Sequence, residues 1–114
     1  MKKISSQSKV AILLAFYEGY EFIDGQIKSI FNQSHKNIEV WISDESRNRS
    51  VSKKFLSKYK KNNPFNVFII DGPGKGSCIN FLHLACNKSI RADFYAFSDQ
   101  DDLWESDKLT KSLN

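Results

Sequence analysis

The sequence has little of what marks several common classes of protein. Its two cysteines, Cys78 and Cys86, stand eight positions apart, a spacing that fits neither a zinc site nor a redox Cys-x-x-Cys pair. We therefore expect both to be reduced core residues, as is usual for a cytoplasmic protein. The two histidines, His35 and His83, have no second His or Cys at ligand spacing. We expect structural roles for them.

Long hydrophobic runs are also missing. The first apolar run, Val10–Phe16, is too short to span a bilayer, and no convincing small-residue cleavage site follows it. We expect a protein that is not exported. The composition, 40% hydrophobic and 26% charged over 114 residues, is that of one globular domain, and it sets aside disordered, collagen-like and coiled-coil classes.

The positive charge lacks the arrangement of a nucleic-acid-binding surface. The net charge of +4 comes largely from lysines at residues 53–61 and at the two termini. No stacking aromatics are interleaved with them, and no zinc-finger, RNA-recognition or basic-zipper pattern occurs. Such a run is usually a solvated helix face. We expect no nucleic-acid partner.

Four short apolar runs, by contrast, alternate with amphipathic segments. The runs are residues 10–16, 38–42, 66–70 and 93–97. The segments between and after them have helical spacing and cover residues 20–33, 51–59, 77–86 and 105–113. This alternation predicts an α/β fold of three α/β/α layers around a parallel sheet. We expect the strand order 3-2-1-4, with ligands bound where the order reverses between strands 1 and 4.

Two finer expectations concern the ends and faces of these elements. Residues 1–8 are polar and are expected to form a flexible N-terminus before a domain at residues 9–114. The fourth strand is expected to be buried. In the third helix, the apolar spacing predicts a buried face made of Ile79, Leu82, Ala85 and Cys86.

Acidic residues follow each predicted strand. Shortly after the fourth strand, Asp99, Asp101 and Asp102 fall within four residues of one another. Carboxylates this near to each other repel unless a cation lies between them. A hard cation such as Mg²⁺ takes one or two carboxylates and fills its other positions with water and phosphate oxygens. The alternative is a solvated acidic loop that caps the next helix.

A glycine-rich stretch after the third strand invites a comparison with phosphate-binding loops. Residues 71–77 read Asp-Gly-Pro-Gly-Lys-Gly-Ser. A P-loop needs Gly-Lys followed directly by Ser or Thr, and here Gly76 intervenes. We therefore interpret this stretch as a turn into the next helix.

Five ordered motifs resemble a known family, the inverting glycosyltransferases of family 2, and within it the bacterial rhamnosyltransferase-like branch. The motifs are residues 15–19, 26–39, 43–45, 76–81 and 97–104, the last reading Phe-Ser-Asp-Gln-Asp-Asp-Leu-Trp. The resemblance runs from Val10 to Lys108. It implies the GT-A fold, with a Rossmann-like sheet that binds a nucleoside diphosphate sugar.

The resemblance also implies roles for five residues. Asp44 resembles the carboxylate that hydrogen-bonds the nucleotide base, and Ala15 and Tyr17 resemble residues that line the base site. Asp99 resembles the acid near the ribose and the metal. Asp101 resembles the acid that holds the divalent cation, Mg²⁺ or Mn²⁺, which bridges the diphosphate. Three departures are Phe16 for a usual Thr, Glu18 for Asn and Glu45 for Asp.

The implied activity is transfer of a sugar from a nucleoside diphosphate sugar to a polysaccharide or lipid-linked acceptor. We expect a cytoplasmic enzyme. Peripheral association of the full enzyme with the inner face of the membrane is left open. The resemblance places the general base and the acceptor-binding half beyond Asn114, so no catalytic residue is assigned and the chain is expected to be a truncated donor-binding part.

Two alternatives stay open at this point. One is a nucleotide-sugar-binding fragment without transfer activity. The other is a receiver-type or flavodoxin-like signalling domain, which would need a phosphoacceptor at the end of the third strand, where only Asp71 stands.

Overall fold

A computed structural model describes residues 8–61, 65–99 and 104–113, and within them the side chains of residues 77, 78, 81, 99 and 111–113 are outside the description. The elements are β1 (Val10–Phe16), α1 (Tyr20–Phe31), β2 (Ile38–Asp44), α2 (Arg49–Leu56), the 3-10 helix η1 (Ser57–Lys60), β3 (Asn66–Asp71), α3 (Ser77–Ala85), β4 (Phe94–Asp99) and α4 (Lys108–Leu113). The predicted alternation of strands and helices is confirmed.

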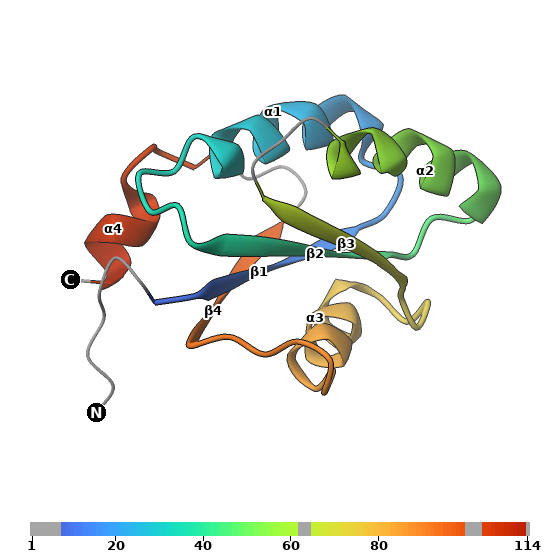
Figure 1. The fold of residues 1–114 in the computed structure, drawn as a ribbon. Coiled ribbons are helices and arrows are strands. Elements are labelled where there is room, and N and C mark those ends of the chain that lie inside the picture. The colour runs from blue at the N-terminus through green and yellow to red at the C-terminus, as the bar shows by residue number, and fades with distance from the viewer. Residues whose placement is uncertain (1–7, 62–64, 100–103, 114) are drawn as a thin grey trace.

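The four strands form one parallel sheet in the order β3-β2-β1-β4. This is the order predicted from the sequence. Helices α1 and α2 cover one face of the sheet and α3 lies against the other (Figure 1). The three-layer architecture is therefore confirmed, with the order reversing between β1 and β4.

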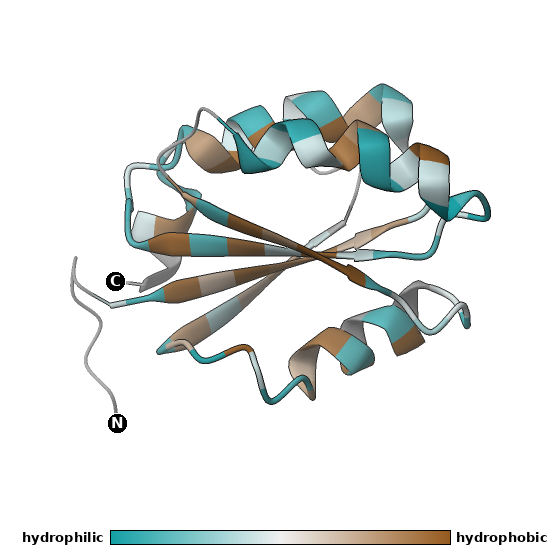
Figure 2. Ribbon diagram, turned by 45° about the vertical axis from the view of Figure 1, so that its right-hand side comes forward, coloured by the Kyte–Doolittle hydropathy of each residue, from teal (hydrophilic) through white to brown (hydrophobic). Residues whose placement is uncertain are grey.

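Strand β1 lies at the centre of the core. All seven of its residues are buried, because its two faces meet different helices. Ile12 and Leu14 belong to the larger apolar cluster beneath α1 and α2, whereas Ala11 and Leu13 belong to a smaller cluster beneath α3. The brown apolar colour accordingly gathers on the strands between the helical layers (Figure 2).

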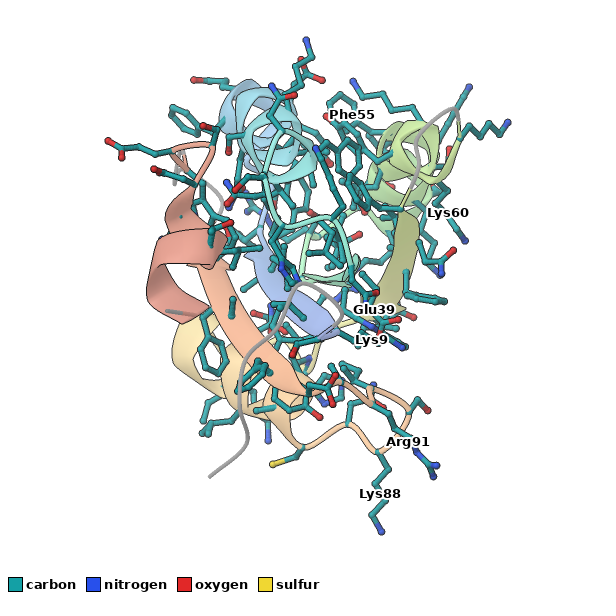
Figure 3. All side chains as sticks on the ribbon, turned by 60° about the vertical axis from the view of Figure 1, so that its left-hand side comes forward. Lys9, Glu39, Phe55, Lys60, Lys88 and Arg91 are labelled. Atoms are coloured by element: carbon teal, nitrogen blue, oxygen red, sulfur yellow. The ribbon has the colours of Figure 1, made fainter. Side chains whose placement is uncertain are left out.

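An ion pair between a half-exposed lysine and a buried glutamate lies at the amino end of the sheet. Nζ of Lys9 lies 3.0 Å from Oε2 of Glu39, and the two side chains meet in Figure 3. Oε1 of Glu39 also accepts a hydrogen bond from the indole N–H of Trp41 at 3.0 Å. Because Glu39 is only 6% exposed, these two donors compensate for removing its charge from water.

The predicted buried face of α3 is wrong. Ile79 is 41% exposed and Leu82 is 55% exposed, and Ala85 and Cys86 are exposed as well. Asn80 and Leu84, one helical turn apart, are buried instead. Two hydrogen bonds join Asn80 to Ser43 on β2: the Asn80 amide donates to the carbonyl oxygen of Ser43, and the Ser43 hydroxyl donates to Oδ1 of Asn80. A polar contact, not the apolar spacing, thus decides which side of α3 faces the sheet.

Two further expectations are corrected. Cys86 is free but exposed, so it is not a core residue. Strand β4 is buried on one face only, because Tyr95 is 47% exposed and Phe97 is 53% exposed. Tyr95 pairs with Ala11 and Phe97 pairs with Leu13, so both lie on the face of the sheet against which α3 packs at β1 and β2.

No described helix has both the length and the apolar character that crossing a membrane would require.

Candidate functional site

The register of the sheet brings the ends of its strands to one edge. Phe16 pairs with Asp44, Ala15 pairs with Asp99, and Asp44 pairs with Asp71. We call this edge the carboxyl rim and define it as residues 15–18, 43–47, 71–72 and 99. Residues separated by up to 84 positions in the sequence therefore meet there, as parallel crossovers require.

Asp44 is fully buried at the end of β2. Its Oδ1 atom accepts the backbone N–H of Ser46 at 2.9 Å, and its Oδ2 atom accepts the hydroxyl of Ser52 on α2. Both carboxylate oxygens therefore bind the protein itself. The contact with a nucleotide base that the resemblance implies stays a prediction.

An ion pair joins the turns that follow β1 and β2. Nε of Arg47 donates to Oε2 of Glu18 at 3.1 Å, and the backbone N–H of Glu18 donates to the hydroxyl of Ser46 at 3.1 Å. The side-chain and backbone hydrogen bonds from Arg47, and then its charge, hold the pKa of Glu18 below its usual value. Glu18 has a φ of 48°, which is uncommon for a residue with a side chain.

The other described acids of the rim also have donors within the protein. Oε2 of Glu45 accepts the backbone N–H of Lys75 at 2.9 Å. Oδ1 of Asp71 lies 3.1 Å from Nη1 of Arg49 and 3.6 Å from Nζ of Lys53. Among the described residues, no three His, Cys, Asp or Glu side chains are grouped as a metal would need. The metal ligands that the resemblance implies, Asp99 and Asp101, stay a prediction.

The remaining predicted site residues are placed as follows. Ala15 is 5% exposed in β1, and Tyr17, directly after that strand, is 50% exposed. The backbone of Asp99 ends β4 opposite Ala15, while its side chain is outside the description. Asp101 and Asp102 lie outside the described residues.

A buried polar contact fixes the end of β2 against α3. The amide Nδ2 of Asn80 donates to the carbonyl oxygen of Ser43 at 3.1 Å, and the Ser43 hydroxyl donates to Oδ1 of Asn80. Gly72 lies against this pair, because a Cβ at its position would be 2.9 Å from Oδ1 of Asn80 and 3.0 Å from Oγ of Ser43. The glycine therefore permits close packing beside the rim.

Sequence reasoning missed three polar residues, two in α1 and one just after it. Gln26, Ser29 and Gln33 hydrogen-bond the residues that flank the acidic segment after β4. A signal for Gln26 and Ser29 was present, because residues three apart share one side of a helix. Gln33 lies two residues beyond the end of α1.

Residues 11–114 match the family described as glycosyl transferase family 2. The chain belongs to this family. It is 30% identical over 107 residues to a protein of Shigella flexneri named dTDP-rhamnosyl transferase RfbG, covering 89% of this chain and 36% of that protein. It is 26% identical over 107 residues to the putative teichuronic acid biosynthesis glycosyltransferase TuaG of Bacillus subtilis, covering 91% of this chain and 40% of that protein.

Solved structures show the same fold. S. aureus TarS in complex with UDP-GlcNAc superimposes with a TM-score of 0.66 at 21% identity, over 91% of this chain and 30% of TarS. The mannosyltransferase PcManGT from Pyrobaculum calidifontis, in complex with GDP-Man and Mn²⁺, gives a TM-score of 0.71 at 16% identity, over 85% of this chain and 28% of PcManGT. The α/β sheet of this family 2 chain is thus the GT-A fold.

The family match also decides between the glycosyltransferase fold and the signalling-domain fold that the sequence left open. A receiver-type or flavodoxin-like signalling domain is set aside. The chain spans between about one sixth and two fifths of the length of the curated relatives that it matches.

Proposed function

We propose that this chain is the donor-binding part of a glycosyltransferase that moves a sugar from a nucleoside diphosphate sugar to a polysaccharide or lipid-linked acceptor. The observation that carries the proposal is the register, which puts the end of β4 with Asp99 beside the ends of β1 and β2 in a family 2 fold. Relatives named for rhamnosyl transfer and teichuronic acid biosynthesis support the class of acceptor.

The phosphate end of the donor is assigned to the acids after β4. Carboxylate oxygens are hard ligands and fit Mg²⁺ or Mn²⁺, and the described acids elsewhere on the rim already accept hydrogen bonds or ion pairs from the protein. We assign Asp101 and Asp99 to the cation. A bound cation offsets the charge that develops on the departing nucleoside diphosphate. The complex of PcManGT with GDP-Man and Mn²⁺ supports this choice.

The base end of the donor is assigned to the turns after β1 and β2. The exposed ring of Tyr17 offers a stacking surface beside the backbone of Ala15. Asp44 lies behind them and orders the turn at Ser46. The Glu18–Arg47 ion pair adds two charged groups to these turns. A nucleotide base bound there therefore meets a more polar surface than it would in family members that have Asn at the position of Glu18.

The general base and the acceptor site are assigned to parts of the full-length enzyme outside residues 1–114, since the relatives are longer than this chain. Residues 1–114 alone should then transfer sugar slowly, because general-base assistance is typically worth about 10²- to 10⁴-fold. A cytoplasmic enzyme that associates peripherally with the inner face of the membrane fits a lipid-linked acceptor.

Calorimetric titration tests the assignment of the two ends. UDP, GDP and dTDP are titrated into wild type, Asp101→Asn and Asp44→Asn, each with Mn²⁺ and with chelator. Asp101→Asn keeps the side-chain shape and removes one charge from the cation site, so it should abolish most of the dependence on Mn²⁺. Asp44→Asn should weaken nucleotide binding and leave the ratio between metal and chelator unchanged.

The control is Asp93→Asn, which removes a carboxylate at the opposite end of β4, where Asp93 accepts the backbone N–H of Lys9. It should bind nucleotide with the wild-type dependence on Mn²⁺. Equal affinity of the wild type in chelator and in Mn²⁺ would rule out the assignment of Asp101 to a metal.

A further inference from the structure

Positive charge is concentrated in one stretch of the chain. Residues 46–61 contain seven Lys or Arg and no Asp or Glu, which is a formal charge of +7. The rest of the sequence contains ten Lys or Arg and 13 Asp or Glu, which is a formal charge of −3. The net charge of +4 therefore combines two regions of opposite sign. A solvated surface usually mixes both signs, whereas such asymmetry indicates an anionic partner.

This stretch folds as α2 and η1, and its lysines lie outside the core. Ser52, Leu56 and Tyr59 recur at helical spacing and are at most 7% exposed, so they form the side that faces the core. The lysines between and after them are all exposed, and we call them the basic face: Lys53, Lys54, Lys58, Lys60 and Lys61.

Acids of neighbouring elements offset only the beginning of the stretch. Glu18 pairs with Arg47, and Asp71 pairs with Arg49, each at 3.1 Å. Oδ1 of Asp71 also lies 3.6 Å from Nζ of Lys53. These three contacts end at residue 53, so the four lysines from residue 54 onward take no part in them.

The later lysines lie on the outside of the helical layer that α1 and α2 form over the sheet (Figure 1). Nζ of Lys58 lies 4.1 Å from the centre of the Phe55 ring. Asp24 on α1 is already ion-paired with Lys28, at 2.9 Å. The ion pairs between described residues include neither Lys54 nor Lys60. The charge of this part of the basic face is therefore presented to solvent.

The surroundings of the basic face favour a lipid bilayer over a nucleic acid. Surfaces that bind nucleic acids interleave cations with exposed aromatic rings on which bases stack. The rings of Phe55 and Tyr59 instead pack against the apolar core. All five cations are lysines, which are point charges without the fixed fork of arginine, and they suit mobile anionic headgroups. Val51 is 53% exposed one turn before Lys54, so an apolar side chain also reaches the interface.

We propose that the basic face binds an anionic lipid bilayer, so that the chain docks on a membrane through its helical layer. The inference rests on the part of the proposed function that puts the full enzyme at a membrane. Helix α2 begins beside the carboxyl rim, after Asn48, and η1 continues away from it to Lys60, against β3. A bilayer on the basic face therefore leaves the carboxyl rim open to a soluble donor.

Co-sedimentation with lipid vesicles tests the proposal. The chain is mixed with vesicles of phosphatidylcholine alone and of phosphatidylcholine with phosphatidylglycerol, at low and at high salt. We expect binding only to vesicles that contain phosphatidylglycerol, and weaker binding at high salt. Each basic residue near an anionic surface strengthens binding about fivefold, so Lys54→Gln combined with Lys60→Gln should weaken it about 25-fold.

The matched control removes the same charge from another surface. Lys88→Gln combined with Arg91→Gln changes two exposed cations between α3 and β4, far from Lys60 (Figure 3). This variant should bind vesicles close to the wild-type level. Lys54→Arg combined with Lys60→Arg keeps the charge and should also bind like wild type. Urea unfolding of each double variant checks that the fold is retained.

Several results would overturn the inference. One is a wild type that binds no vesicles, or that binds phosphatidylcholine alone equally well. Another is an equal loss in the two Gln double variants, because net charge rather than the basic face would then decide. A third is tighter binding to single-stranded RNA than to the anionic vesicles.

Nucleotide titration separates this inference from donor binding. A chain that binds UDP with Mn²⁺ but binds no vesicles loses only the membrane-docking surface. A chain that binds anionic vesicles through the basic face but binds no nucleotide keeps this surface, and the donor-binding part of the proposed function fails instead.

Discussion

The Nε atom of Arg47 lies 3.1 Å from the Oε2 atom of Glu18 and joins the turn after β1 to the turn after β2. Because this contact holds the pKa of Glu18 below its usual value, the carboxylate stays ionised to lower pH in the folded chain than in the unfolded chain. Its contribution to stability is therefore present above the unfolded pKa and is lost as the pH falls through the lowered, folded pKa.

NMR titration of the Glu18 carboxyl carbon checks this prediction. The midpoint should lie below the usual range in wild type and should rise toward that range in Arg47→Ala. Arg91→Ala, which removes an exposed arginine elsewhere, should leave it unchanged. An identical midpoint in wild type and Arg47→Ala would show that the ion pair does not persist in solution.

Gly72→Ala should destabilise the fold. The added Cβ would overlap Cγ of Glu45 and lie 2.9 Å from Oδ1 of Asn80, and overpacking of this kind usually lowers the free energy of unfolding by about 1–3 kcal/mol. Urea unfolding provides the measurement. Gly25→Ala, at an exposed position inside α1, is the matched control and should raise stability by about 0.5–1 kcal/mol. A neutral Gly72→Ala would mean that the Ser43–Asn80 contact can shift freely.

Ser52→Ala should also destabilise the chain, because it removes the hydroxyl that the buried Asp44 carboxylate accepts. A buried acceptor left without its donor typically costs about 1–3 kcal/mol. Ser57→Ala removes a hydroxyl that donates to the carbonyl oxygen of Lys54 at an exposed site, and it should change the free energy of unfolding by less than about 0.5 kcal/mol. Equal urea midpoints for these two variants would show that the Ser52–Asp44 hydrogen bond does not stabilise the fold.

The free energy of unfolding should fall at alkaline pH because of Tyr59. Burial, followed by the nearby charge of Asp24, raises the pKa of the Tyr59 hydroxyl well above 10. Between the unfolded and the folded pKa the unfolded chain loses this proton and the folded chain keeps it, so stability falls as the pH rises above about 10. Thermal unfolding from pH 8 to 11 should show a smaller decline for Tyr59→Phe than for wild type. Parallel declines would show that Tyr59 is not responsible.

Much of the fold was predictable because the strands of a parallel sheet carry a strong signal. The unbroken apolar run of β1 indicates burial on both faces, and β1 is buried along its whole length. The order 3-2-1-4 follows from helices on both faces, and it predicts that Asp44 and Asp99 lie on one edge of the sheet, as they do. The ends of the helices were predicted less well: the sequence predicts helices at 20–33 and 105–113, whereas α1 ends at Phe31 and α4 begins at Lys108.

The features that the sequence did not predict depend on hydrogen bonds between polar side chains that are far apart in the sequence. Apolar spacing alone assigned Ile79 and Leu82 to the core, but the hydrogen bonds of Asn80 turn α3 the other way. The family resemblance singles out Asp44, yet nothing in the sequence shows that Ser46 and Ser52 hydrogen-bond both of its oxygens.

The central place of β1 governs the order in which the sheet can assemble. Val10 pairs with Ile38, 28 positions later, and with Phe94, 84 positions later. One edge of β1 therefore stays unpaired until residues 94–99 have been synthesised. Pairing β1 with β4 closes a loop of the whole intervening chain, and closing so long a loop slows folding. During that interval an uncharged segment, Val-Ala-Ile-Leu-Leu-Ala-Phe, has an open hydrogen-bonding edge, which is the kind of sequence that aggregates. Yield of soluble chain should therefore depend on synthesis rate and chaperone supply more than on the equilibrium stability of the finished fold.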